Sequence, residues 1–268
     1  VLATGETEGY YAMFAADPAG QLARVLGEGF AFQGEPDHHG KPRGEPSAAL
    51  PPSKFVVFAQ NHDQIGNRAC GERLRSLVAD DALRAALALT ALTPMIPLFF
   101  MGEPWGSRAP FLFFTDFQAP LDAQVREGRR REFAHFAAFA DEARRAAIPD
   151  PNAPSTFDAS VADIAEAAHG EGAQWAEWFT ALLAVRRTHL QPHVDTARAV
   201  RAIAIGPGAV CAEWSLGSGT WRVAVNFGDG AVALPRLHGG REALAVNRGD
   251  DPTQLPPAAF VAEFATGG

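Results

Sequence analysis

The chain has 268 residues, 47% of them hydrophobic, which is enough for one large domain or two moderate ones with a sizeable core. Its net charge of −8 argues against nucleic acid as the main partner, because phosphate binding needs clustered Lys and Arg. Cys70 and Cys211 are too far apart in the sequence to match a metal-binding motif, and two cysteines are too few for a disulfide scaffold. No signal peptide and no apolar run long enough to span a bilayer is visible. We therefore expect a soluble, cytoplasmic protein without a membrane partner.

The N-terminal part of the chain predicts one helix and one long loop. Asp17 followed by Pro18 is typical of a helix start, because the first residue caps and the second fits the first turn. Residues 33–54 are rich in Gly, Pro, His and charge, which predicts a long loop. His38 and His39 fall in this loop, where we expect solvated surface and not a metal site.

Two continuous apolar runs, 55–59 and 96–101, have the length of strands, and a helix is predicted between them over residues 81–92. Continuous apolarity, as opposed to alternation, predicts parallel strands that are buried on both faces. The order strand, helix, strand is typical of an α/β domain.

The next segment predicts helices. One is expected over 121–140, and a second near residues 175–187, where aromatic and aliphatic side chains share one face. The first contains Arg129, Arg130 and Arg131, which we interpret as a solvated helix face and not as a binding patch.

After about residue 196 the pattern changes to short β-like runs separated by Gly and Pro, namely 199–205, 210–215, 221–226, 231–234 and 260–264. This predicts a small, sandwich-like all-β domain over 196–268, following an α/β domain over 1–195. Trp214 and Trp221 could form a sugar platform there, but core packing is the favoured interpretation.

The first apolar run ends in four polar residues, Asn61, His62, Asp63 and Gln64. In parallel α/β sheets and barrels, ligands bind beyond the carboxyl ends of the strands. The four side chains combine hydrogen-bond donors and acceptors, which suits a ligand covered in hydroxyl groups. From the pattern alone, a strand end closed by an Asx-type turn is an equally open interpretation. A metal site is not favoured, because adjacent residues at a strand end point to opposite sides.

The second apolar run ends in a stretch that contains Glu103 and Trp105, which would reach the same rim in one parallel barrel. A Trp face stacks well on the apolar face of a sugar ring. Further on, Phe113 is interpreted as part of a packed loop, while Phe114 and Asp116 stay open. We take Glu103, Trp105 and Phe114 as candidate substrate-binding residues.

The residues at both strand ends resemble a known family. The two stretches are FAQNHDQIGNRACGERL and LTPMIPLFFMGEPWGSRAPFLFFTDF, and together they resemble the last two strand-loop units of the α-amylase family barrel. The Asn-His-Asp triplet occurs across that family, whereas NHDQIGNR with GERL and then FFTD is similar to the maltooligosyltrehalose trehalohydrolases. The stretches TGETEGYYAMF and REGRRREFAHF also fit, so the resemblance covers essentially the whole chain.

The resemblance implies the C-terminal part of a (β/α)8 TIM-type barrel followed by the β-domain. It implies a retaining glycosidase that cleaves the α-1,4 bond next to the terminal trehalose of maltooligosyl trehalose, in trehalose biosynthesis and without a cofactor or metal. Asp63 matches the carboxylate that stabilises the transition state, and His62 matches the histidine that binds the same sugar. Asn61, Gln64 and Arg68 are implied as further substrate-binding residues.

Two departures from the family's pattern matter. No segment before Asp63 resembles the strand ends that carry the family's nucleophile and acid, and the chain begins at Val1 and not at Met. We therefore expect both residues in a preceding N-terminal part of the same enzyme, and no hydrolysis by this fragment alone. Relatives also commonly have Gly-Glu-Glu or Gly-Gln-Glu after the last strand, whereas this chain has Gly102, Glu103 and Pro104. The second acidic side chain is absent, so substrate contacts from that loop stay an open question.

Two alternatives stay open at this stage. One is another α-glucan hydrolase or a branching enzyme of the α-amylase family, which would release products other than trehalose. The other is a non-catalytic carbohydrate-binding remnant, which would keep the hydroxyl-binding rim without the carboxylate pair.

Overall fold

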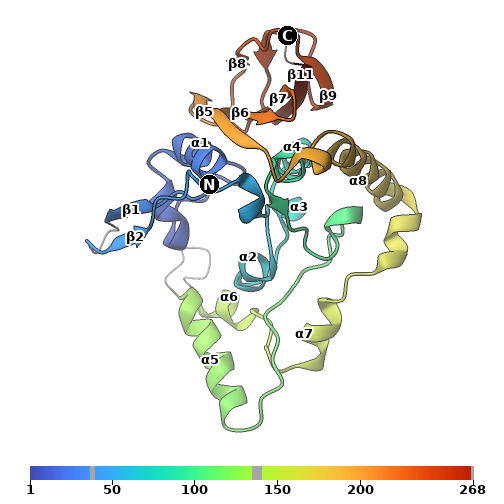
Figure 1. Cartoon of the computed structure of the whole chain (residues 1–268). Coiled ribbons are helices and arrows are strands. Elements are labelled where there is room, and N and C mark those ends of the chain that lie inside the picture. The colour runs from blue at the N-terminus through green and yellow to red at the C-terminus, as the bar shows by residue number, and fades with distance from the viewer. Residues whose placement is uncertain (37–39, 135–140, 267–268) are drawn as a thin grey trace. The chain divides into compact units, whose positions relative to one another are not determined.

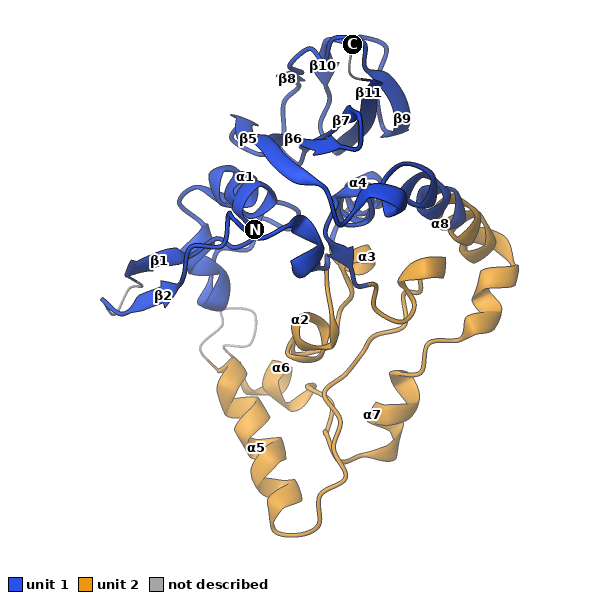
Figure 2. Ribbon diagram, viewed as in Figure 1, with its two compact units in different colours: residues 1–59, 78–98, 180–268 blue, residues 60–77, 99–179 orange. Residues whose placement is uncertain are grey.

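The computed structural model describes residues 1–36, 40–134 and 141–266 (Figure 1). The chain forms two compact units (Figure 2): the first contains residues 1–59, 78–98 and 180–268, and the second contains residues 60–77 and 99–179. Each unit is thus built from segments that are distant in the sequence. The boundary between residues 195 and 196 that the sequence predicts stays a prediction.

The first unit begins with the short 3-10 helix η1 (Gly9–Phe14) and with α1 (Pro18–Glu28). The predicted helix start is confirmed, because the Asp17 carboxylate accepts a hydrogen bond from the N–H of Gly20 at 3.0 Å. The helix ends at Gly29, whose φ of 97° suits glycine. An added Cβ there would lie 2.2 Å from the ring of Phe55, so the close packing also requires glycine.

The prediction of one long loop over 33–54 was wrong for part of that range. Strands β1 (Gln33–Pro36) and β2 (Pro42–Gly44) pair antiparallel, and the 3-10 helix η2 (Pro52–Lys54) follows. Gly, Pro and charged residues are typical of a loop, but they also occur in a short, exposed pair of antiparallel strands. His38 and His39 lie outside the described residues.

Strands β3 (Val56–Val57) and β4 (Ile96–Pro97) pair in parallel, and α4 (Asp80–Leu92) lies between them in the sequence. The predicted order strand, helix, strand is therefore confirmed, although both strands are shorter than expected. The prediction that they are buried on both faces was wrong, since Val56 is 57% and Ile96 is 40% exposed. Among the residues that the structure describes, no further strand pairs with β3 or β4, and one face of the pair is open to water.

The C-terminal part of the first unit is a β-region, as the sequence predicts. After the 3-10 helix η6 (Gln191–His193), a five-stranded antiparallel sheet has the order β5-β6-β7-β11-β9. A second, two-stranded sheet pairs β10 with β8. The strands are β5 (Arg198–Gly206), β6 (Ala209–Leu216), β7 (Gly219–Asn226), β8 (Val232–Ala233), β9 (Arg241–Val246), β10 (Gln254–Leu255) and β11 (Ala259–Thr266).

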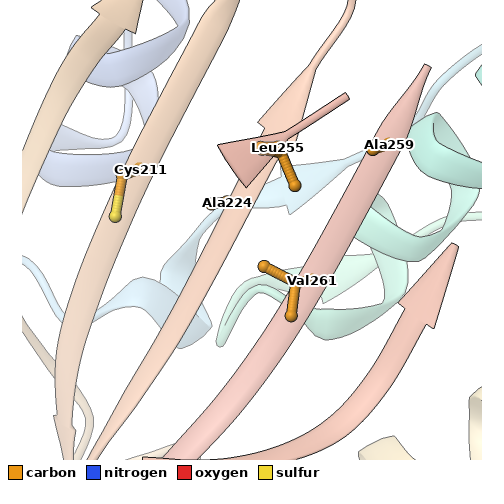
Figure 3. Packing of buried hydrophobic residues seen from close by; sticks show 5 residues of the cluster. All are labelled: Cys211, Ala224, Leu255, Ala259 and Val261. Carbon is orange, nitrogen blue, oxygen red and sulfur yellow. The ribbon is translucent and has the colours of Figure 1, made fainter. Parts of the chain in front are cut away.

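The larger sheet is covered on both faces within this unit. On one face, Leu255 of β10 packs with Val261 and with Cys211, Ala224 and Ala259 in a buried apolar cluster (Figure 3). On the other, α1 packs against β5 and β6, and α4 packs against β7 and β11. Trp214 and Trp221 are fully buried, which confirms core packing.

The second unit is helical and irregular. Its helices, in chain order, are α2 (His62–Gly66), α3 (Leu74–Leu77), η3 (Glu103–Trp105), α5 (Leu121–Phe133), α6 (Glu142–Ala146), α7 (Pro154–Ala159) and η5 (Ile164–Ala168). The predicted helix 121–140 is confirmed up to residue 133, and residues 135–140 lie outside the described part. Helix α8 (Gly170–His189) begins in this unit, and its predicted apolar face is confirmed by the buried Trp175, Phe179 and Leu182. Within the described ranges, none of the helices could cross a membrane.

Candidate functional site

The residues that follow β3 in the sequence form the first turn of a short helix and not a strand end. Asn61 has extended backbone angles and caps α2: its side-chain oxygen accepts hydrogen bonds from the N–H groups of Asp63 at 2.8 Å and Gln64 at 3.4 Å. In return, the Gln64 side-chain oxygen accepts from the N–H of Asn61 at 3.0 Å. This reciprocal capping box fixes the backbone at the start of the helix. The Asn61 contact to Asp63 is also the Asx-type bond that the alternative interpretation required.

His62 and Asp63 project from this turn into solvent. Their side chains are 67% and 65% exposed, and the His62 Nε2 atom lies 3.4 Å from Asp63 Oδ1. The expectation that they point to opposite sides was wrong, because they occupy a helical turn and not an extended strand. An exposed carboxylate beside an imidazole can accept hydrogen bonds from, and donate them to, the hydroxyl groups of a bound ligand.

A buried hydrogen bond joins Gln60, the residue before this turn, to Glu103 in the loop after β4. Gln60 is 3% exposed, and its amide nitrogen donates to the Glu103 carboxylate at 2.9 Å. Its amide oxygen accepts from the N–H of Leu74 at 3.0 Å. The second Glu103 oxygen accepts from the N–H of Phe100 at 2.7 Å. Glu103 is itself only 4% exposed, so its carboxylate serves contacts within the protein.

Burial has a strong effect on this carboxyl group. Removal from water raises the pKa of Glu103 to about 7, and the hydrogen bonds from Gln60 and Phe100 and the charge of Arg73 oppose that shift only in part. Arg73 is 1% exposed and donates to the carbonyl groups of Met101 at 2.7 Å and Ala109 at 2.5 Å. The loop that begins at Glu103 is thus held from both sides by buried polar groups.

Trp105 ends the 3-10 turn η3 and is partly buried. The carbonyl group of Glu103 accepts a hydrogen bond from the indole N–H of Trp175 at 3.0 Å, which holds the turn against α8. Gly106, with φ of 61°, closes it, and an added Cβ there would lie 2.8 Å from the Trp175 ring. The indole N–H of Trp105 is buried and has no hydrogen-bond partner among the described residues.

The other end of α2 is held by Arg129 of α5. Its guanidinium donates to the carbonyl groups of Gly66 and Arg68, both at 2.9 Å, and lies over the rings of Phe113 and Phe133. Arg129 is 6% exposed, so the interpretation of this arginine cluster as a solvated helix face was wrong at this position. The free carbonyl groups at the C-terminal end of the short helix α2 accept hydrogen bonds from the Arg129 guanidinium, which makes burial of that charged group favourable.

Phe114 belongs to a row of aromatic rings. Neighbouring rings in the order Phe100, Phe111, Phe114 and Phe157 have centroids 5.0, 5.7 and 5.2 Å apart, each pair edge to face. Phe114 is 37% exposed and is therefore accessible to an apolar surface of a ligand. Asp116 is also exposed.

The predicted site residues thus fall into three groups. Asn61, His62, Asp63 and Gln64 share one turn, while Arg68 lies just beyond the helix and pairs with Glu72 at 3.4 Å. Glu103 is tied to this segment through Gln60, and Trp105 lies in the same turn as Glu103. Phe114 belongs to the aromatic row. Within the described ranges, no cluster of three potential metal-ligating side chains occurs.

Gln60, Arg73 and Arg129 were not anticipated from the sequence. Gln60 directly precedes the polar triplet, but its partner is 43 positions away. The local sequence around either arginine carries no signal that it will be buried. Only the register of a folded chain places them opposite backbone carbonyl groups.

Residues 197–261 match a family model described as a domain of unknown function, DUF3459. The chain is 37% identical over 249 residues to a malto-oligosyltrehalose trehalohydrolase of Arthrobacter ramosus, which covers 88% of this chain and 39% of the relative. A protein of the same description from Deinococcus radiodurans is 41% identical over 195 residues, 70% of this chain and 31% of the relative.

Among solved structures, the chain is similar to a candidate alpha amylase from Salmonella typhimurium. The TM-score is 0.88 at 39% sequence identity, over 99% of this chain and 44% of that chain. The resemblance that the motifs indicate is therefore confirmed, both in sequence and in fold. The chain spans less than half the length of each of these relatives.

Proposed function

We propose that this chain is part of a glycosidase that releases trehalose from maltooligosyl trehalose, as a step of trehalose biosynthesis. The similarity to malto-oligosyltrehalose trehalohydrolases supports this assignment. The observation that carries it is the exposed His62–Asp63 pair on a turn whose backbone is fixed by the Asn61–Gln64 capping box. A rigid, solvent-facing carboxylate and imidazole fit a sugar that presents hydroxyl groups.

The proposed chemistry is retaining hydrolysis of an α-1,4 bond. Such a reaction needs a carboxylate nucleophile and a carboxylic acid roughly 5 Å apart, on opposite sides of the bond that breaks. Asp63 cannot serve both sides. We assign it the third role, in which it holds hydroxyl groups of the reacting sugar more tightly as the ring distorts toward the transition state. The nucleophile and the acid would come from another part of the same enzyme.

A barrel supplies the setting for this arrangement. The parallel pair β3–β4 has an apolar face on which Val56, Phe58, Ile96 and Leu98 are between 39% and 57% exposed. Such a face would be covered if further strands continued the sheet on both edges and closed it. We propose that β3 and β4 are two strands of a (β/α)8 barrel, with the C-terminal β-domain beside it.

The remaining predicted site residues have groups available for a sugar. Asn61 and Gln64 use their side-chain oxygens in the capping box, so their amide NH2 groups can donate to ligand hydroxyls. We propose that these two, with His62, Arg68, Trp105 and Phe114, bind substrate. Glu103 reaches a sugar directly only if one of its two hydrogen bonds opens, so its proposed part is indirect.

A cytoplasmic location is part of the proposal. Cys70 and Cys211 are both free, which fits a reducing compartment. No cofactor is required by the proposed hydrolysis.

The test is product analysis with the complete product of the gene that encodes this chain. Incubation with a maltooligosyl trehalose of defined length should release trehalose and the shortened maltooligosaccharide in equal amounts. Glucose or maltose as the main product would favour another α-glucan hydrolase, and transfer of glucan without net hydrolysis would favour a branching enzyme. Binding without any turnover would identify a carbohydrate-binding protein and contradict the proposal.

A further inference from the structure

We propose that Glu103 is a positioning residue that sets the place of Asp63 through Gln60. The inference rests on the proposed function and adds a buried residue that supports the site without contacting the substrate. It starts from the two carboxylate oxygens of Glu103, each of which accepts a hydrogen bond from within the protein: one from the Gln60 amide at 2.9 Å, the other from the N–H of Phe100 at 2.7 Å.

Gln60 transmits the position of this carboxylate to the rim. It is 3% exposed and directly precedes Asn61, the residue that caps α2. Both ends of its amide are used, because the oxygen accepts from the N–H of Leu74 at 3.0 Å while the nitrogen donates to Glu103. An amide engaged at both ends has one orientation, so the backbone at residue 60 is fixed where α2 begins.

Glu103 is itself held in place by its surroundings. Its carbonyl group accepts from the indole N–H of Trp175, and the buried Arg73 donates to the carbonyl groups of Met101 and Ala109 on either side of the turn. The carboxylate is therefore a fixed point. It joins the segment that carries His62 and Asp63 to the turn that carries Trp105. Both oxygens of the Glu103 carboxylate and both ends of the Gln60 amide have hydrogen-bond partners, and a buried pair satisfied in this way is rigid.

The chemistry of the pair suggests a swap experiment. In Glu103→Gln, the new amide has one oxygen, while two donors, the Gln60 amide and the Phe100 N–H, need an acceptor. The second variant Gln60→Glu/Glu103→Gln removes this conflict. The new carboxylate at position 60 would accept from the backbone N–H of Leu74 and from the new amide NH2 at position 103. The oxygen of that amide would accept from the backbone N–H of Phe100. The pattern of donors and acceptors is then complete again.

Steady-state kinetics of trehalose release by the complete gene product test the proposal. Glu103→Gln should lower kcat about 10- to 100-fold with little change in KM, because a small misplacement of a catalytic group has that effect. The swapped pair should restore most of the loss. In an Asp63→Asn background, Glu103→Gln should cause no further loss, since it acts through Asp63. Glu177→Gln, an exposed site on α8, is the matched control and should behave like the wild type.

Three kinetic results would overturn the proposal: a raised KM with unchanged kcat, which indicates direct substrate contact; an equal loss with and without Asp63; or a swapped pair that restores nothing. Hydrogen exchange read by mass spectrometry supplies a measurement independent of activity. Glu103→Gln should speed exchange of the amides of residues 61–66, and the swapped pair should slow it again. If Glu103→Gln does not fold, the swapped pair should still fold with protected amides, and its failure to do so would count against the proposal.

The failure of the two proposals can be told apart. A wild-type protein that releases no trehalose contradicts the proposed function. Comparing hydrogen exchange of the amides of residues 61–66 between the wild type and Glu103→Gln then still decides whether Glu103 orders this turn. Unchanged exchange in Glu103→Gln would overturn the positioning role even if trehalose is released.

Discussion

The guanidinium of Arg129 donates a hydrogen bond to the carbonyl oxygen of Gly66 across 2.9 Å, at the C-terminal end of the helix that begins at His62. A second bond, to the carbonyl of Arg68, has the same length. The helix with the exposed His62–Asp63 pair is therefore fixed at its start by a capping box and at its end by a buried cation. A five-residue helix has little stability of its own, so these outside contacts decide whether it forms.

We predict that Arg129→Met destabilises the protein and lowers kcat. The substitution leaves the buried carbonyl groups of Gly66 and Arg68 without their donor, which costs about 2–4 kcal/mol in the free energy of unfolding. Urea unfolding and trehalose release would be measured side by side. Arg131→Met is the matched control, because that arginine is exposed on the same helix. Equal effects of the two substitutions would contradict the assigned role.

We predict that the free energy of unfolding depends on pH through the ionisation of Glu103. Burial raises its pKa from 4.5 to about 7, so the folded state holds the proton more tightly than the unfolded state. The corresponding stability is fully present below about pH 4.5 and is lost as the pH rises to about 7. Relative to Glu103→Gln, we expect the free energy of unfolding to fall by about 3 kcal/mol over this window.

Urea unfolding of both proteins at several pH values between 4 and 8 gives the difference directly, since the contributions of other groups cancel between them. A difference that stays constant with pH would mean that the Glu103 carboxyl group titrates normally. A difference that changes in the opposite direction would mean that the charged form is the favoured one in the folded state.

Arg186 should be a strong determinant of stability in the first unit. Its guanidinium donates to three carbonyl groups near the end of α4, those of Ala91, Thr93 and Met95, at 2.6–2.8 Å. Desolvation lowers the pKa of Arg186 to about 10, but the group stays charged at neutral pH. Arg186→Met should cost about 2–4 kcal/mol in urea unfolding, because three buried acceptors lose their donor. Arg187→Met, the exposed neighbour, should change little.

The exposed apolar face of β3 and β4 gives opposite predictions for the 268-residue chain and for the complete gene product. In the chain alone, Val56→Thr/Ile96→Thr should raise solubility with little change in the free energy of unfolding, because both side chains face water. In a closed barrel the same substitutions would bury two hydroxyl groups and destabilise the protein. Light scattering and urea unfolding of both forms would decide, and an equal effect in the two forms would contradict the proposed barrel.

The sequence pointed to the polar rim because Asn61, His62 and Asp63 are adjacent and follow an apolar run. Period and capping rules likewise located α1, α4, α8 and most strands of the larger sheet. Strand β9 escaped detection, since Arg241 and Glu242 at its start have the polarity of a loop, and it pairs with β11 alone. The length of β3 could not be inferred either, because an apolar run does not show where pairing stops.

The supporting contacts of the site were beyond sequence reasoning for a different reason. Gln60 and Glu103 meet across 43 positions, and Arg129 reaches Gly66 across 63. A buried glutamine or arginine has the same local sequence context as an exposed one. Their roles follow only from the acceptors and donors that the fold places opposite them.

The measurement that tests the central claim most directly is the kcat of Asp63→Asn for trehalose release by the complete gene product, with Asp81→Asn on α4 as the exposed control. We predict a loss of about 100- to 1000-fold for Asp63→Asn, because the amide no longer offers a charged acceptor in the transition state, and no loss for the control. Substrate binding, measured by calorimetry, should persist in both variants. An Asp63→Asn protein that retains wild-type kcat would contradict the account.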